Sequence, residues 1–341
     1  MIRILYFVVI LLGVTSTGVL SARAEDGAFK MSFPLSCTLG TDCWMLYYVD
    51  VNRTPDVIED YSCGKRTYDQ HKGTDVMIRD KAAMEKGIDV IAAAPGKVLR
   101  LRDSVADDFK TPEEMKAVID AGIECGNGVF VGHEGGYATQ YCHLKKGSIV
   151  VKEGDDIARG QKIGEVGISG MAEHPHLHFS VYKDKKLIDP FGGQDVEAED
   201  CRQGDLGARL YWDDSMPLRN EAPIFLDSGF SDVMPDFDLI PQGQRGHVPE
   251  LGAKAFIFWG VIYDIRQGDY VVMDIIDQEG REVVKRTISQ DKSRIRQYYA
   301  AGRKIAKGMP AGTYTGRIAL TRVMDDGSTQ TYRHEQQITL Q

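Results

Sequence analysis

The chain has 341 residues, and its 41 Lys and Arg residues against 50 Asp and Glu residues give a formal net charge of −9. A hydrophobic share of 43% excludes a wholly disordered chain. The length predicts two domains, because single hydrophobic cores usually stop growing near about 250–300 residues. The acidic balance argues against a nucleic-acid-binding protein, which needs a basic surface.

The first 24 residues have the pattern of an export signal. Arg3 gives a positive start, an apolar run follows from Ile4 to Val14, and Ala22-Arg23-Ala24 has the small-x-small form of a signal-peptidase site. The apolar run is shorter than the ~20 residues that a membrane span needs. We therefore expect cleavage after Ala24, an exported protein, and no membrane-spanning segment in the mature chain.

Cysteine usage fits an oxidising compartment. The count is even and no C-x2-C pair exists, so disulfides are favoured over a cysteine-based zinc site. The six residues are Cys37, Cys43, Cys63, Cys125, Cys142 and Cys201. We expect a Cys125–Cys142 bond, because the intervening segment resembles one hairpin; the sequence does not assign the other two pairs.

The region after the signal begins with residues 25–65, which mix aromatics with turns and predict an N-terminal wrap around a core. Short strands separated by glycine-rich turns follow, and this pattern predicts an antiparallel all-β fold. The expected strands lie at residues 89–94, 97–102, 128–131, 137–144 and 176–181.

One helix interrupts these strands. Thr111 is a suitable N-cap, Pro112 suits the first helical position, and Glu114 completes a capping box. Met115, Val118 and Ile119 form an apolar stripe that we expect to pack on the sheet, and Gly122 ends the helix.

The remaining chain predicts a second β unit. Residues 206–218 are expected to be a linker, and residues 219–341 an accessory β-sandwich whose last hairpin turns at Asp325-Asp326-Gly327. The predicted organisation is a signal peptide at 1–24, a first domain at 25–205 with its motifs in 60–192, the linker, and the sandwich.

Six of the eight histidines fall between residues 71 and 178, in two main patterns. The run from His176 to Val181 alternates polar and apolar residues, which is typical of a half-buried strand. Residues two apart on a strand face the same way, so His176 and His178 are expected side by side, with Leu177, Phe179 and Val181 facing the core.

The second pattern is His71-Lys72-Gly73-Thr74-Asp75, a loop that enters a strand. A neutral imidazole and a carboxylate are ligand types that zinc accepts, although this spacing alone is weak evidence. A third element is Tyr141-Cys142-His143, where we expect Tyr141 and His143 on one strand face and the Cys142 disulfide on the back.

These elements together resemble the lysostaphin-type zinc metallopeptidases, a family of peptidoglycan endopeptidases. The matching stretches are HKGTD at 71–75, AAPGKV at 93–98, GNGVFVGHEGGYATQYCHL at 126–144, VKEGDDIARGQKIGEVGISG at 151–170 and HPHLHFSV at 174–181. The resemblance covers roughly residues 60–192. The helical insert, the cysteines and His174 depart from the family pattern.

The resemblance implies a role for each matching residue. His71, Asp75 and His178 are the implied zinc ligands, with one Zn²⁺ per chain, and His143 and His176 are the implied catalytic histidines. Two imidazoles and one carboxylate leave a coordination position open, as catalytic zinc sites do. His133 lies in the matching stretch beside a hairpin turn, where we expect it to be structural or to line the rim.

The implied function is hydrolysis of peptide cross-links in peptidoglycan, with peptide stems as the partner. Export without wall-anchoring repeats favours the periplasm. Two alternatives are a metal-free relative that binds peptidoglycan or activates another hydrolase, and a biotin- or lipoyl-carrier module. The complete set of ligand types disfavours the first, and the absence of a suitable lysine hairpin disfavours the second.

Overall fold

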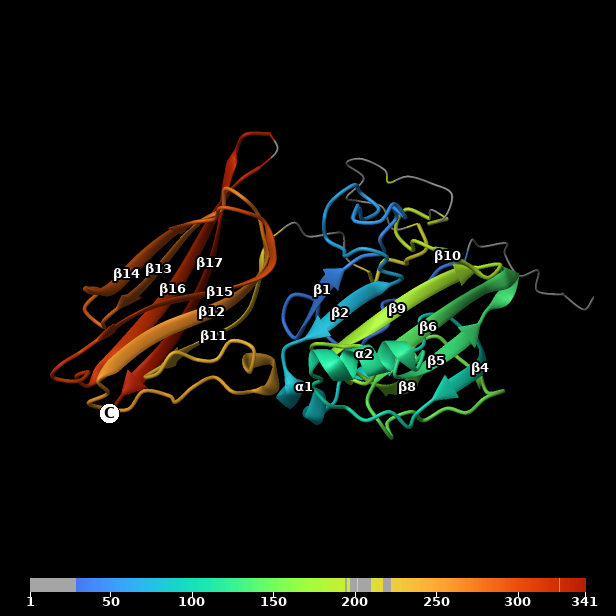
Figure 1. Ribbon diagram of the computed structural model, residues 1–341, viewed down its shortest axis with the longest axis horizontal. Coiled ribbons are helices and arrows are strands. Elements are labelled where there is room, and N and C mark those ends of the chain that lie inside the picture. Colours follow the sequence, from blue (N-terminus) through green and yellow to red (C-terminus); the bar gives the residue numbers. More distant parts are fainter. Residues whose placement is uncertain (1–28, 194, 197–200, 202–209, 217–221, 325) are drawn as a thin grey trace, which may run out of the picture.

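The computed structural model describes residues 29–193, 195–196, 201, 210–216, 222–324 and 326–341. The predicted export signal lies outside these residues, as do positions 206–209 and 217–218 of the predicted linker. Within the described residues, no helix combines the length and the apolar character that crossing a bilayer requires. Two β-rich units lie side by side (Figure 1).

The first unit is built on an eight-stranded antiparallel sheet. Seven strands run in the order β1-β2-β9-β6-β5-β4-β7, and β10 pairs with β9. Their bounds are β1 Cys43–Tyr47, β2 Thr74–Ile78, β4 Gly96–Arg102, β5 Asn127–Gly132, β6 Tyr137–Leu144, β7 Asp156–Ile157, β9 His176–Lys183 and β10 Lys186–Ile188. Two further strands, β3 (Asp89–Ile91) and β8 (Lys162–Glu165), pair separately.

The two faces of this sheet differ in chemistry, as the alternation on β9 predicts. Leu177, Phe179 and Val181 are buried in the main core of the unit. His176, His178 and Ser180 alternate with them and therefore project from the opposite face. We call this opposite face the site face.

In the part of the first unit that the structure describes, two α-helices and one 3₁₀ segment, η1 (Glu134–Gly136), accompany the sheet. The predicted helix is α2 (Pro112–Asp120), and its N-cap Thr111 and Glu114 form the expected capping box. The apolar stripe of this helix packs only in part, because Val118 is buried but Ile119 is 49% exposed. A second helix, α1 (Lys81–Lys86), was not predicted, since its six residues are too few to show an apolar period.

The second unit is a β-sandwich, which confirms the predicted fold class. One sheet has the order β11-β12-β15 and the other β14-β13-β16-β17. The bounds are β11 Ile224–Ser231, β12 Ala255–Ile265, β13 Tyr270–Ile276, β14 Glu282–Ser289, β15 Arg294–Lys304, β16 Gly312–Val323 and β17 Thr329–Leu340, with a 3₁₀ segment η2 at Ile240–Gln242. Phe256 and Phe258 of one sheet and Met273 and Ile318 of the other share the core between them.

A separate apolar cluster joins the two units. Trp44 of β1 and Met77 of β2 pack with Trp259 and Val261 of β12. Met77 lies opposite both Trp44 and His176 in the antiparallel register. Because residues directly opposite each other project to the same face, the sandwich covers the site face just beyond β2.

Three disulfides are present: Cys37–Cys43, Cys63–Cys201 and Cys125–Cys142. The last confirms the predicted pair. Residues 210–216 of the predicted linker pack on the first unit, where Trp212 is 2% exposed and pairs with Met31 in a parallel bridge.

Candidate functional site

Three potential metal-ligating side chains meet on the site face. His71 precedes β2, Asp75 is its second residue, and His178 lies opposite Asp75 on the adjacent β9. His178 Nδ1 is 2.8 Å from Asp75 Oδ1, and His71 Nε2 is 3.2 Å from both of those atoms. The antiparallel pairing of β2 with β9 therefore brings together residues 103 positions apart.

Neighbouring groups fix which nitrogen of each imidazole carries the proton. His71 Nδ1 donates to the Tyr48 carbonyl at 2.7 Å. Ser180 Oγ donates to the Lys72 carbonyl at 2.7 Å, so it accepts from His178 Nε2 at 3.1 Å. His71 Nε2 and His178 Nδ1 are consequently lone-pair nitrogens in the neutral rings.

This donor set fits a metal cation. Two ring nitrogens and a carboxylate oxygen converge within 4.8 Å of one another. Tetrahedral zinc with ligand bonds of about 2.0–2.2 Å separates its ligand atoms by about 3.3–3.5 Å. The observed separations of 2.8–3.2 Å are close to that spacing.

The surroundings of Asp75 favour the ionised form of its side chain. Asp75 is 3% exposed, and such burial by itself raises the pKa of a carboxyl group. The imidazoles of His71, His176 and His178 outweigh that effect and hold the pKa of Asp75 well below its usual range. Asp75 is therefore an ionised, acceptor-only group at neutral pH.

The two predicted catalytic histidines lie beside this cluster. The ring centroids of His143 and His176 are 4.6 Å apart, and those of His143 and His178 are 5.8 Å apart. His143 Nδ1 donates to the Ser169 carbonyl and His176 Nδ1 to the His174 carbonyl, each at 2.8 Å. Each neutral ring thus keeps an Nε2 lone pair. Burial lowers the pKa of His143 well below its usual range, and His176 and His178 add to this effect.

The predicted arrangement of Tyr141, Cys142 and His143 was wrong. Tyr141 lies opposite Phe179 and packs in the core, whereas Cys142 lies opposite His178 and therefore projects from the site face. His143 reaches that face because its φ of 62° breaks the strand alternation. This left-handed conformation costs about 1–2 kcal/mol in a residue with a Cβ, and it leaves no mark in the residue pattern.

Two further histidines of the first unit have different surroundings. The ring centroids of His174 and His176 are 4.9 Å apart. Burial, with a smaller contribution from His176, lowers the pKa of His174 to about 3. His133 contacts the Pro95 carbonyl and Thr139 Oγ1 through its two nitrogens, each at 2.8 Å, in the structural role expected for it.

Several groups that contact the site histidines could not be identified from the sequence. The carbonyls of Tyr48 and Ser169 give no signal, because every residue has one. Ser180 lies in the recognised motif, and its spacing of two from His178 is the one signal that identifies it. Gly73 has a steric role, since a Cβ there would lie 2.6 Å from Cε1 and Nε2 of His178.

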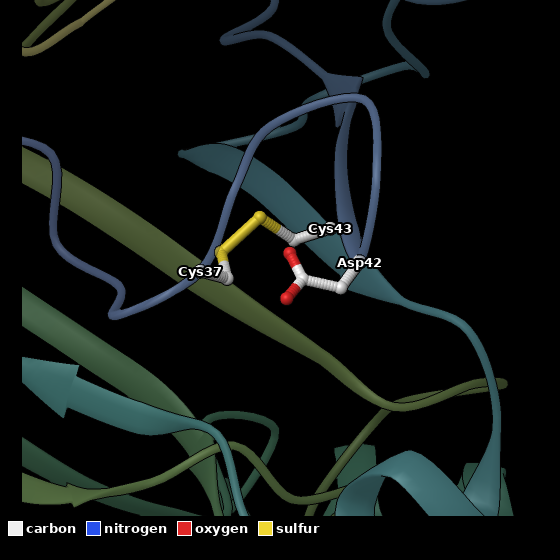
Figure 2. A group of neighbouring side chains, drawn as sticks. All are labelled: Cys37, Asp42 and Cys43. Atoms are coloured by element: carbon white, nitrogen blue, oxygen red, sulfur yellow. A yellow bond between two sulfur atoms is a disulfide. The ribbon is translucent and has the colours of Figure 1, made fainter.

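A second group of metal-type residues has a different explanation. Cys37, Asp42 and Cys43 lie close together (Figure 2). Both sulfurs are bonded to each other, so neither is available as a thiolate ligand. Asp42 Oδ1 instead accepts a hydrogen bond from the backbone N–H of Thr38 at 2.6 Å.

Residues 69–190 match the sequence profile of Peptidase family M23. They form a peptidase family M23 domain. The matched range contains His71, Asp75, His143, His176 and His178, and the resemblance stated from the sequence is confirmed. The family match supports peptidase activity for this domain.

Two relatives each match a part of this chain. An uncharacterized metalloprotease of Buchnera aphidicola is 32% identical over 124 residues, covering 36% of this chain and 29% of that protein. The peptidoglycan DD-endopeptidase ShyB of Vibrio cholerae is 36% identical over 81 residues, covering 24% and 18%. This chain thus spans less than a third of the length of either relative.

Among solved structures, the catalytic domain of the antimicrobial peptidase lysostaphin from Staphylococcus simulans is similar at 24% identity and a TM-score of 0.25. The match covers 36% of this chain and 76% of that one.

Proposed function

We propose that this protein is an exported zinc endopeptidase that hydrolyses peptide cross-links of peptidoglycan. His71, Asp75 and His178 would hold the metal, and His143 and His176 would act as the catalytic histidines. The observation that carries the proposal is the convergence of two lone-pair nitrogens and an ionised carboxylate on one sheet face. The relative ShyB is a peptidoglycan DD-endopeptidase, and this similarity supports the substrate class.

The chemistry requires groups that move protons beside the metal ligands. A zinc ion bound there supplies Lewis-acid chemistry, lowering the pKa of water and polarising a carbonyl group. His143 and His176 present their Nε2 atoms as proton acceptors, because their Nδ1 atoms donate to backbone carbonyls. One imidazole can take the proton of the attacking water, and the other, once protonated, can donate to the oxyanion or to the leaving amine.

The second candidate, a metal-free adapter of another hydrolase, predicts a degraded ligand set. All five positions instead carry competent side chains, and His71 and His178 are oriented by a carbonyl and a hydroxyl. Such orienting contacts are typical of working metal sites. We favour the periplasm and the D-alanyl–diaminopimelate cross-link as the location and the bond.

Metal content and hydrolysis, measured on matched variants, test the ligand division. We expect one zinc per wild-type chain, and we expect His178→Ala to lose both zinc and hydrolysis. His143→Ala and His176→Ala should keep zinc and lose hydrolysis. If His143→Ala released zinc as readily as His178→Ala, the division would be wrong, and a wild-type protein that takes up no zinc would favour the adapter.

The bond is identified from the products. Purified sacculi digested with the full chain should release muropeptides whose masses show hydrolysis of the D-alanyl–diaminopimelate bond. Release of fragments with intact cross-links would contradict this assignment.

A further inference from the structure

The site face continues past the histidines onto three more strands. Ser180 of β9 lies opposite Gln140 of β6, Gln140 lies opposite Phe130 of β5, and Phe130 lies opposite Arg100 of β4. Residues in direct antiparallel register project to the same face. Arg100 is therefore on the same surface as the candidate metal ligands.

A pocket of about 390 Å³ opens on this part of the surface. Arg100, Arg102, Phe130 and Gln140 line it, together with Glu124. Two guanidinium groups in one pocket form a local cationic site on a chain whose formal net charge is −9. Within the described part of the chain, no salt bridge occupies either arginine, and none joins them to Glu124.

The arginines are held in place by contacts that leave their charge available. The Cζ atom of Arg100 lies 4.6 Å from the centroid of the Phe130 ring. Arg102 donates one hydrogen bond, from a terminal guanidinium nitrogen to the Gly126 carbonyl at 3.3 Å. A stacked guanidinium still presents its N–H edge, which matches the two oxygens of a carboxylate.

Several contacts restrain the residues beneath the two arginines. Tyr182 donates its hydroxyl proton to Gln140 Oε1 at 3.1 Å, and its ring lies 5.8 Å from that of Phe130, centroid to centroid. The Cys125–Cys142 disulfide closes against Gly128, where a Cβ would lie 2.9 Å from Cys125 Sγ. The cationic pocket is thus preformed, which reduces the entropy lost when a ligand binds.

The strand spacing gives an estimate of how far the pocket lies from β9, the strand that carries His178. Three strand spacings of about 4.8 Å separate β9 from β4, or about 14 Å in all. An extended peptide advances about 3.3–3.6 Å per residue, so the backbone of β4 is about four residues away. The Arg100 side chain leans toward β5 over Phe130, which shortens this distance.

We propose that Arg100, with Arg102 beside it, binds a free carboxylate of the stem peptide two to four residues from the scissile bond. The proposal rests on the proposed function and specifies it, because it makes the enzyme selective for stems whose carboxylates are not amidated. Arg100 is a specificity-determining residue in this scheme and takes no part in proton transfer.

Paired substrates test the proposal. The zinc-loaded full chain is given two cross-linked muropeptides that differ only in whether the free carboxylates of the stem are amidated. We expect wild-type kcat/KM to favour the carboxylate form by about tenfold, a factor within reach of one charge-assisted hydrogen bond. Arg100→Gln should bring this ratio close to one, mainly through KM, and Arg100→Lys should restore part of it.

Lys97→Gln is the matched control. It removes one positive charge from the same strand, but Lys97 pairs with Asp156 at 2.7 Å and does not line the pocket. We expect this variant to keep the wild-type preference. Equal loss of preference in Lys97→Gln and Arg100→Gln would point to general charge and overturn the assignment, as would a wild-type enzyme that cleaves both substrates equally.

A binding measurement separates this proposal from the proposed function. Calorimetry with an uncross-linked tetrapeptide stem, free or amidated, requires no hydrolysis. If neither muropeptide is cleaved but the free stem binds wild type more tightly than Arg100→Gln, the hydrolase proposal fails and the carboxylate site stands. If the two stems bind wild type equally, the carboxylate site is refuted.

Discussion

Ser180→Ala is a sharp test of how His178 is oriented. In the wild type, Ser180 Oγ donates to the Lys72 carbonyl and accepts from His178 Nε2, at 2.7 and 3.1 Å. This contact fixes the tautomer that turns the Nδ1 lone pair toward Asp75 Oδ1. Alanine removes the acceptor while leaving all three proposed metal ligands in place.

The expected magnitude follows from these two hydrogen bonds. Loss of a partner that orients a metal-bound histidine typically costs 10–100-fold in metal affinity, which corresponds to about 1.4–2.8 kcal/mol. The Lys72 carbonyl also loses its donor, so the metal-free protein should lose about 1 kcal/mol in its free energy of unfolding. The effect on zinc affinity should therefore exceed the effect on stability.

The assay is zinc titration against a competing chelator, combined with urea unfolding of the metal-free protein. Ser148→Ala is the matched control, because Ser148 Oγ also donates to a carbonyl, that of Lys145, at 2.6 Å. It also accepts from the Glu165 N–H, and it lies outside β2 and β9, the strands that carry Asp75 and His178. This control should lose similar stability and keep wild-type zinc affinity.

Unchanged zinc affinity in Ser180→Ala would refute the reasoning, because His178 would then not depend on Ser180 for its orientation. A loss of affinity as large in Ser148→Ala would also refute it, since the effect would then come from general destabilisation.

Three other predictions concern the scaffold. Replacing Cys125 and Cys142 by serine opens a crosslink of sequence separation 17 and should cost about 3 kcal/mol in urea unfolding; an unchanged midpoint would contradict this. Trp259→Ala empties a fully buried position in the cluster between the units and should cost about 3–5 kcal/mol, whereas a loss below about 1 kcal/mol would show that this cluster contributes little. Burial lowers the pKa of His133 below 6.5, so the unfolded chain binds a proton that the folded protein does not, and stability falls as the pH drops below about 6.5. The free energy of unfolding of His133→Gln should fall less between pH 7 and pH 5.5, and a slope as steep as that of the wild type would exclude His133 as a contributor.

Local sequence patterns determined several strand, helix and disulfide features of this protein. Alternation over His176–Val181 fixed which side chains share a face, because the period of two follows from strand geometry alone. The cap at Thr111 and the hairpin between Cys125 and Cys142 were equally local, and both appear as predicted. The resemblance to the family motif implied that His71, Asp75 and His178 belong to one site.

Tertiary structure decided what surrounds those residues. The groups that orient His71 and His143 are carbonyls 23 and 26 positions away, and a carbonyl is common to every residue. The positive φ of His143 breaks an alternation that the residue pattern continues. Long-range strand pairing placed Arg100 on the site face and the sandwich beside β2, because a register between distant strands depends on the packing of the whole sheet.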